Sequence, residues 1–196
     1  MSPRQVVELN PPLVLASASP QRRKLLERLG VSFTLRPTGV AEVEHGDPAE
    51  VAVENALRKA RAARIGEEPE TILGVDTLVA LGPRIYGKPA DEAQARETIS
   101  ALAGATHEVL SGVALLRGEC EQIALARTEV VFRDCDEALV ERYVASGEWR
   151  EKSGGYAIQG LGAMLVREIH GDYENVVGLP LATLLDMVPE LLSPAR

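Results

Sequence analysis

Cysteine is scarce in this sequence, and that scarcity limits what the protein can be. Cys120 and Cys135 are the only two cysteines, and neither belongs to a CxxC pair. Neither a disulfide framework nor a zinc site is therefore indicated, and we expect neutral thiols. Aromatic residues make up only 4% of the chain and do not alternate with cations. This composition disfavours a single-strand nucleic-acid binder, which stacks bases on aromatic rings.

The chain also lacks an excess of positive charge and any long apolar run. Its formal net charge of -8 argues against broad binding to nucleic acid, which relies on a basic surface. Residues 1–12 have no apolar centre of a signal peptide, and no later stretch reaches the roughly 18 apolar residues of a membrane span. We therefore expect a cytoplasmic protein without a membrane partner. The apolar content of 45% suffices for a sizeable core, as one large domain or two closely joined lobes.

The stretch LVLASASPQRRKLLERL, residues 13–29, is the most informative part of the sequence. Its apolar start predicts a buried strand, and Ser19 followed by Pro20 predicts the beginning of a helix. Arg22, Arg23 and Lys24 then crowd the helix N-terminus, where the helix dipole favours acids over cations. An anion bound at this N-terminus would explain the crowding. The alternative is a capped surface helix whose cations are solvated.

Two segments follow that could complete an anion site. Glu42 and Glu44 stand just after a turn and could supply a carboxylate to it, although either alone reads as a solvated loop residue. Asp47 and the proline after it predict a second helix. Helical spacing places Asn55 and Lys59 on one side of that helix, and Lys59 points either to a shared cleft or to solvent.

Asp76 stands between two apolar strand segments, residues 71–74 and 78–81. A lone carboxylate there is costly to desolvate unless a cation, a metal or a hydrogen-bond donor meets it. Thr77 beside it is a poor turn former, so a functional role is favoured over a turn. Lys88 lies between a glycine and a proline, and a hairpin would bring it back toward Asp76.

The remaining chain predicts further α/β structure. Strands are expected over 106–131 and 163–169, helices over 91–103 and 136–145, and an apolar helical run over 175–188 bent at Pro180. His107 has no metal-ligand spacing around it and is predicted to be structural. The segment 153–162 holds four glycines around Gln159, which indicates either close strand packing or close approach to a ligand.

Four segments in fixed order carry a resemblance to a known family. They are SASPQRRKLL, GVDTLVAL with YGKP, GATHEVLSGVAL, and YVASGEW followed by SGGYAIQGLGAMLV and GDYENVVGLPL. Over residues 13–188 the chain resembles the Maf family of nucleoside triphosphate pyrophosphatases. The resemblance implies an α/β, two-lobed, inosine triphosphatase-like fold with a mixed central sheet, flanking helices and an inter-lobe cleft. We expect one such domain over 13–190, with tails at 1–12 and 191–196. The resemblance also implies a cytoplasmic protein and a homodimer, as family members often are.

The resemblance also implies a reaction and a set of residues. Such enzymes split a nucleoside triphosphate into the monophosphate and pyrophosphate with a divalent metal, Mg²⁺ or Mn²⁺. The family motifs assign Asp76 as the proton acceptor, with direct metal binding by Asp76 as the open alternative, and place Glu42 near the metal. The remaining assignments bind the phosphates (Ser17, Arg22, Lys59 and Lys88) or select the base (Gln21, Thr77 and Gln159).

The motifs point to one branch of the family more than to another. YAIQG together with VDT is similar to the branch that hydrolyses dTTP and UTP. Gln21 departs from that branch, which usually has arginine there, and the spacing SPxRRxLL is closer to the 7-methyl-GTP branch. Because YAIQG and VDT match the first branch, we expect a dTTP/UTP pyrophosphatase. The alternatives are a 7-methyl-GTP pyrophosphatase and a nucleotide-binding regulator of cell division that does not hydrolyse.

Overall fold

The computed structural model describes residues 7–66 and 69–192, and the strands of this part of the chain form one seven-stranded mixed sheet. The strands are β1 (Leu13–Leu15), β2 (Phe33–Leu35), β3 (Thr71–Leu81), β4 (Arg84–Tyr86), β5 (Thr106–Arg117), β6 (Cys120–Phe132) and β7 (Val166–His170). The helices are α1 (Pro20–Arg28), α2 (Pro48–Ala62), α3 (Glu92–Leu102), α4 (Glu137–Ala145), α5 (Tyr173–Val177) and α6 (Leu181–Met187), with 3₁₀ turns η1 (Ser153–Gly155), η2 (Leu161–Met164) and η3 (Pro189–Leu192).

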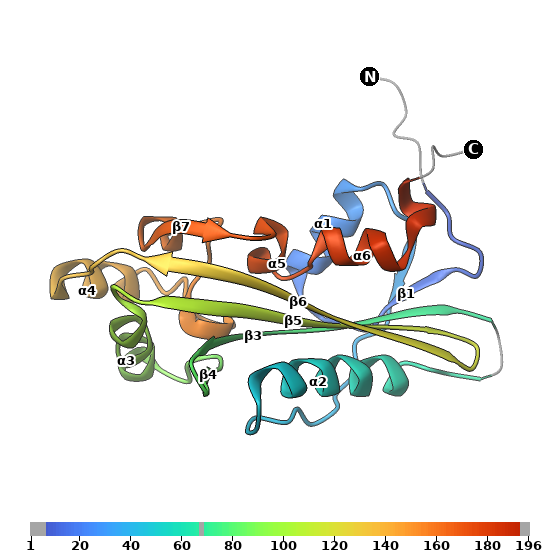
Figure 1. Ribbon diagram of the computed structural model, residues 1–196, viewed down its shortest axis with the longest axis horizontal. Coiled ribbons are helices and arrows are strands. Elements are labelled where there is room, and N and C mark those ends of the chain that lie inside the picture. Colours follow the sequence, from blue (N-terminus) through green and yellow to red (C-terminus); the bar gives the residue numbers. More distant parts are fainter. Residues whose placement is uncertain (1–6, 67–68, 193–196) are drawn as a thin grey trace, which may run out of the picture.

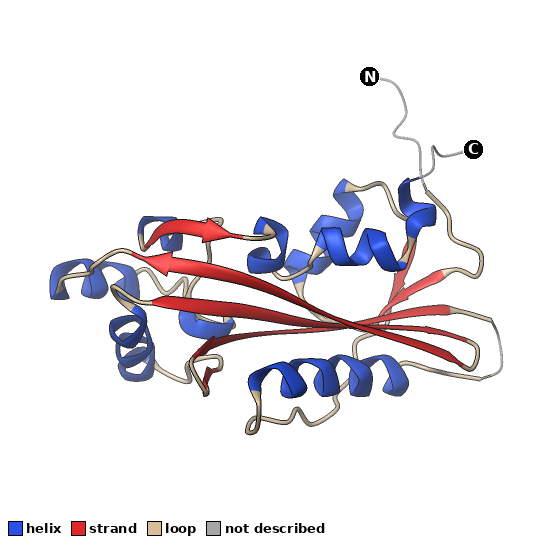
Figure 2. Ribbon diagram, in the orientation of Figure 1, coloured by secondary structure: helices blue, strands red, loops and turns tan. Residues whose placement is uncertain are grey.

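The sheet is built on three long antiparallel strands, β3, β5 and β6, that run the length of the molecule (Figure 1). The strand order is β2-β1-β3-β5-β6-β7, with β4 pairing with β3, and only the β1 pairs are parallel. Helix α2 lies on one face of the long strands, while α5 and α6 lie on the other (Figure 2). Because helices cover both faces, β3 and β5 are buried almost throughout rather than alternating between buried and exposed residues.

Helix α2 approaches the sheet closely because glycine and alanine face each other. A Cβ added at Gly74 would lie 2.2 Å from the carbonyl oxygen of Ala56, and one added at Gly112 would lie 2.1 Å from that of Ala52. No larger residue fits at either glycine without moving the helix. This close packing sets the height of α2 above the sheet, and with it the positions of the polar residues on α2.

Two groups of buried side chains make the two lobes that the resemblance implies. One surrounds α3 and α4 and includes Ile99, Phe132 and Tyr143. The other joins α1, β1 and α6 through residues such as Leu26 and Leu184. Strands β3 and β5 contribute side chains to both groups, so the lobes share one sheet.

Strand β3 has an open edge between the lobes. Its pairing with β1 ends at Leu73, and its pairing with β4 begins at Val79. Among the described strands, none pairs with this edge of β3 between those two residues. Asp76, which the sequence placed between two apolar strand segments, therefore lies inside one continuous strand.

Several predicted boundaries shift in the structure. Strand β2 begins only at Phe33, and Val31 before it forms an isolated bridge with Val7. The strand expected over 163–169 begins later, after η2. The bend at Pro180 is confirmed and separates α5 from α6.

The predicted tails fall partly outside the described residues, which exclude 1–6 and 193–196. Within the remaining part of the predicted N-terminal tail, Leu9 is buried in the core around α1. In the described parts of the chain, none of the helices is both long and apolar enough to cross a membrane.

Candidate functional site

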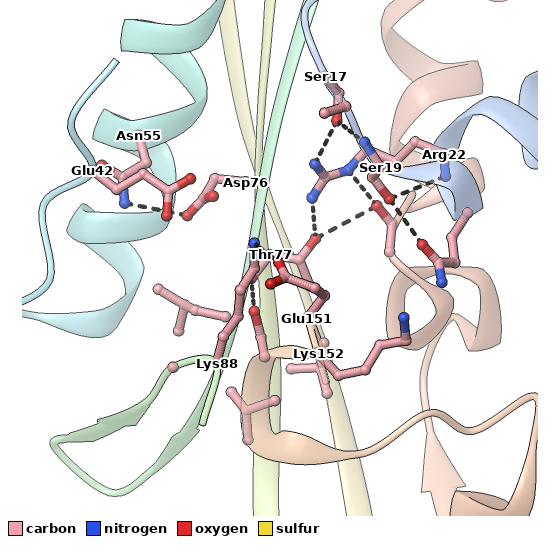
Figure 3. Close-up of a pocket in the computed structure, with 18 of the residues that line it drawn as sticks. Ser17, Ser19, Arg22, Glu42, Asn55, Asp76, Thr77, Lys88, Glu151 and Lys152 are labelled. Carbon is pink, nitrogen blue, oxygen red and sulfur yellow. Dashed lines mark hydrogen bonds and ion pairs between the residues drawn. The ribbon is translucent and has the colours of Figure 1, made fainter. Parts of the chain in front are cut away.

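A cleft of about 970 Å³ opens along the free edge of β3. All of the residues that the family motifs assign to the site line it: Ser17, Gln21, Arg22, Glu42, Lys59, Asp76, Thr77, Lys88 and Gln159. Because successive side chains of a strand point to opposite faces, Asp76 and Thr77 face different sides of the cleft. Figure 3 shows Asp76 with Glu42 and Asn55 on one side of β3, and Arg22 with Ser17 on the other.

The arginine side of the cleft, formed by Ser17, Arg22, Thr77 and the carbonyl of Gly178, holds a buried cation. Helix α1 begins as predicted, with the Ser19 hydroxyl accepting from the Arg22 amide at 3.4 Å. The guanidinium of Arg22 donates to the carbonyl of Gly178 at 2.8 Å and to the hydroxyls of Ser17 at 2.9 Å and Thr77 at 3.0 Å. These three acceptors are neutral.

Arg22 is only 8% exposed, so its charge is largely removed from water. Burial lowers the pKa of Arg22, and the negative charges of Asp76 and Glu42 across the cleft oppose that shift. Arginine stays protonated in proteins, and a buried charge is stabilised when an opposite charge meets it. The arginine side is therefore suited to an anion.

The other two cations of the helix start do not share this site. Arg23 is exposed and pairs with Glu27 one turn later at 2.7 Å, and Lys24 is exposed as well. Consecutive helical residues point about 100° apart, so three neighbours cannot face one cleft. The expectation that all three cations gather around one anion is wrong, and Arg22 alone of the three lines the cleft.

The carboxylate side of the cleft consists of Glu42, Asn55, Lys59 and Asp76. Lys59 contacts Asp76 Oδ1 at 2.5 Å and Glu42 Oε1 at 2.6 Å, so its ammonium bridges two carboxylates. Asn55 donates to Asp76 Oδ2 at 3.3 Å. Asn55 and Lys59 lie one turn apart on α2, on the same side, as the helical spacing predicted. Asp76 is 7% exposed, and hydrogen bonds from these two donors offset the free energy of desolvating its carboxylate.

The donor atoms of the carboxylate side fit a hard divalent cation. Within residues 7–66 and 69–192, no group of three His, Cys, Asp or Glu residues is arranged to hold a metal ion. Mg²⁺ usually takes only one or two protein carboxylates and completes its shell with water and substrate phosphates. Asp76 and Glu42, brought together by Lys59, provide such a pair of oxygen ligands.

The third part of the cleft is formed by Lys88 and the loop before the predicted glycine-rich segment. Lys88 follows β4 and pairs with Glu151 at 3.3 Å, and both side chains are largely exposed. Glu151 has φ of 59°, a backbone conformation that residues other than glycine rarely adopt. Lys152 beside it also lines the cleft (Figure 3). No spacing in the sequence singled out Glu151 or Lys152.

The glycine-rich segment packs directly onto the open edge of β3. Ser153 donates from its hydroxyl to the carbonyl of Thr77 at 2.9 Å. Gly154 has φ of 68°, and a Cβ there would lie 2.6 Å from the side chain of Val79. Close packing therefore explains why residue 154 is a glycine. Gln159 of the same segment is exposed and lines the cleft.

The candidate base-selecting residues differ in how firmly they are held. Thr77 is tied by its hydroxyl to Arg22 and, at 2.8 Å, to the fully buried Ser111. Gln21 accepts a hydrogen bond from Ser19 at 3.2 Å. Sequence reasoning missed Ser111 and the carbonyl of Gly178, because no local pattern links residues so distant along the chain.

His107 is structural, as predicted. It is 1% exposed, and its Nε2 shares a hydrogen bond with the hydroxyl of Tyr156 at 2.9 Å. Burial lowers the pKa of His107 to about 4, so its ring is neutral near pH 7. Tyr156 in turn lines the cleft, which connects this buried pair to the site.

Comparisons with known proteins identify the family of this chain. A model of the Maf family, described as Maf-like protein, matches residues 12–191. A protein from Moorella thermoacetica named dTTP/UTP pyrophosphatase is 47% identical over 181 residues, covering 90% of this chain and 93% of that protein. Proteins of the same name from Gloeobacter violaceus and Pyrococcus furiosus are 45% and 40% identical, covering 91% and 90% of this chain and 95% and 93% of their own lengths. The chain therefore belongs to the Maf family.

Proposed function

We propose that this protein is a nucleoside triphosphate pyrophosphatase that hydrolyses dTTP and UTP to the monophosphate and pyrophosphate. The observation that carries the proposal is Arg22, a buried cation with three neutral partners, in the same cleft as Asp76 and its lysine. The names of relatives at 40–47% identity support the choice of substrate.

The carboxylate side supplies the group that activates water. Asp76 uses Oδ1 toward Lys59 and Oδ2 toward Asn55, and each carboxylate oxygen keeps a further lone pair for a water molecule. The water attacks the α phosphorus as its proton passes to Asp76, while the bond from that phosphorus to the bridging oxygen of the β phosphate breaks. The bridging oxygen leaves with the pyrophosphate.

The cations of the cleft hold the triphosphate and stabilise the charge of the departing pyrophosphate. Arg22 has two N–H groups beyond the three already bonded, and Ser17 lies beside them. Lys88 releases Glu151 readily, because an exposed ion pair contributes about 1 kcal/mol or less. A divalent cation, Mg²⁺ or Mn²⁺, held by Asp76 and Glu42 would add charge stabilisation at the phosphates.

The base is expected to lie among Gln21, Thr77 and Gln159, which line the cleft. The amides of Gln21 and Gln159 can both donate and accept, which suits the mixed edge of a pyrimidine. Thr77 acts on the base only indirectly in this proposal, since its hydroxyl is engaged by Arg22 and Ser111.

A product assay across nucleotides tests the proposal. Purified protein is incubated with Mg²⁺ and dTTP, UTP or 7-methyl-GTP, and the products are resolved by ion-exchange chromatography. We expect dTMP or UMP with an equal amount of pyrophosphate. Release of orthophosphate without pyrophosphate would reject the reaction. A preference for 7-methyl-GTP would reject the base choice, and tight nucleotide binding without any product would favour the regulator.

The assembly and location implied by the resemblance stay predictions. Light scattering coupled to gel filtration checks for the homodimer. Fractionation of cells that express the protein checks the cytoplasmic location.

A further inference from the structure

Asn55 connects the two candidate metal ligands through three hydrogen bonds. Its side-chain oxygen accepts from the amide of Val43 at 2.7 Å, and its nitrogen donates to the carbonyl of Val43 at 3.0 Å. The same nitrogen donates to Asp76 at 3.3 Å. Val43 directly follows Glu42 in the chain, so one amide holds the backbone beside one ligand and the carboxylate of the other.

The loop that carries Glu42 depends on this contact. Residues 36–44 contain neither helix nor strand, so the loop has no ladder to fix its backbone. Its other attachments near Glu42 are the ion pair with Lys59 and the packing of the partly buried Val43 side chain. Glu42 is 47% exposed, and an ion pair at that exposure is a weak restraint.

Asn55 is well suited to serve as a fixed point. It is 3% exposed and lies in the middle of α2, whose height is set by the close contacts with Gly74 and Gly112. A buried amide with both its oxygen and its nitrogen bonded cannot rotate without breaking hydrogen bonds. The position of Asn55 therefore determines, through its hydrogen bonds, where the loop backbone at Val43 and the carboxylate of Asp76 lie.

We propose that Asn55 is a positioning residue that holds Glu42 and Asp76 in the arrangement needed to bind a divalent cation. The inference deepens the proposed function, on which its kinetic test rests. Without Asn55, the cation would have to order the Glu42 loop as it binds, and binding would weaken by that cost.

The first test is independent of nucleotide and metal. Hydrogen exchange is followed in the metal-free protein over a peptide that spans residues 39–46. In Asn55→Ala we expect exchange of the Val43 amide to accelerate on the order of tenfold, the effect of one lost hydrogen bond. Glu54→Ala, which changes the exposed neighbour on α2, serves as the control.

The second test measures the rate of pyrophosphate release against Mg²⁺ concentration. In Asn55→Ala the half-saturating Mg²⁺ concentration should rise on the order of tenfold, while kcat at saturating Mg²⁺ changes less than about threefold. Unchanged exchange in Asn55→Ala, or equally fast exchange in Glu54→Ala, would overturn the inference. A loosened loop with unchanged Mg²⁺ dependence would overturn it too. An inactive wild-type protein would reject the proposed function, and hydrogen exchange would then decide whether Asn55 holds the loop.

Discussion

Strand β3 directs Asp76 toward α2 and Thr77 toward α1. The two sides of the cleft differ in how their buried charges are stabilised. On the carboxylate side, Lys59 lies between Asp76 and Glu42, so opposite charges meet directly. On the arginine side, Arg22 is bonded to two hydroxyls and one carbonyl. Two carboxylates and one ammonium leave the first side with one negative charge, which suits a cation, whereas the second side gains when an anion arrives.

This difference suggests that the two sides of the cleft have different roles in the reaction. Hydrogen bonds from neutral groups fix the direction of a guanidinium without neutralising it, and so leave its charge for a phosphate. A carboxylate held by a lysine keeps its orientation, as a general base requires. The predictions below alter one side at a time, and they run from the largest expected effect to the smallest.

The carboxylate side should be the more sensitive of the two. Asp76→Asn removes the proton acceptor but keeps the shape, so pyrophosphate release should fall by about 10³-fold. Circular dichroism and the melting temperature should show an intact fold. Full activity in this variant would refute Asp76 as the base.

The arginine side should lose activity without losing stability. In Arg22→Met we expect kcat/KM for UTP to fall by about 10²-fold, because charged hydrogen bonds to the triphosphate are lost. The melting temperature without nucleotide should stay within about 4 °C of wild type, since the lost hydrogen bonds are offset by removal of a buried charge. Arg23→Met is a matched control on the neighbouring, exposed position and should leave both quantities unchanged. A large drop in stability in Arg22→Met alone would assign Arg22 a structural role.

A buried histidine outside the cleft, His107, extends the comparison because it has no acid facing it. Its folded pKa of about 4 lies below the usual 6.5, so the unfolded chain binds a proton that the folded protein does not as pH falls through this window. Stability due to the neutral ring is therefore full above pH 6.5 and is lost toward pH 4. At pH 5 this loss is about 2 kcal/mol in the free energy of unfolding.

Urea denaturation at pH 7 and pH 5 measures this loss. His107→Gln should show a pH dependence smaller by that amount. His170→Gln, at an exposed histidine, should behave as wild type. Equal pH dependence in wild type and His107→Gln would contradict the lowered pKa.

The smallest effect is expected from a substitution at Thr77, whose hydroxyl orients Arg22. Thr77→Val removes the hydroxyl that accepts from Arg22 and bonds to Ser111, at nearly constant volume. We expect KM for UTP to rise by about tenfold. Thr77→Ser keeps the hydroxyl and should restore KM, whereas an equal effect of both substitutions would show that the methyl group matters instead.

Local patterns in the sequence predicted much of the fold. Apolar runs and caps such as Ser19, Asp47, Asp91 and Asp136 placed the strands and helix starts, and each of these residues caps a helix in the structure. Boundaries were less accurate where a turn of 3₁₀ helix or an isolated bridge replaced regular pairing. Such endings depend on neighbouring elements rather than on local propensity.

The candidate site was predicted as a set of residues but not as a geometry. The family motifs named the residues that line the cleft, yet they could not show that Lys59 is engaged by two carboxylates or that Arg23 and Lys24 face away. Asn55 shares a helix side with Lys59, which was visible in the sequence. Its bonds to Val43 and Asp76 required the loop and β3 to meet α2.

The sequence by itself determined the family, the α/β class and the identity of the polar residues, because motif order and hydrophobic periodicity are properties of the chain. Only the tertiary structure decided which charges meet. The open edge of β3 arises because β1 ends at Leu15 and β4 returns only to Val79, leaving Asp76 and Thr77 between them. The residues around that gap are far apart along the chain, and long-range packing of sheet and helices, not local propensity, sets the distances between them.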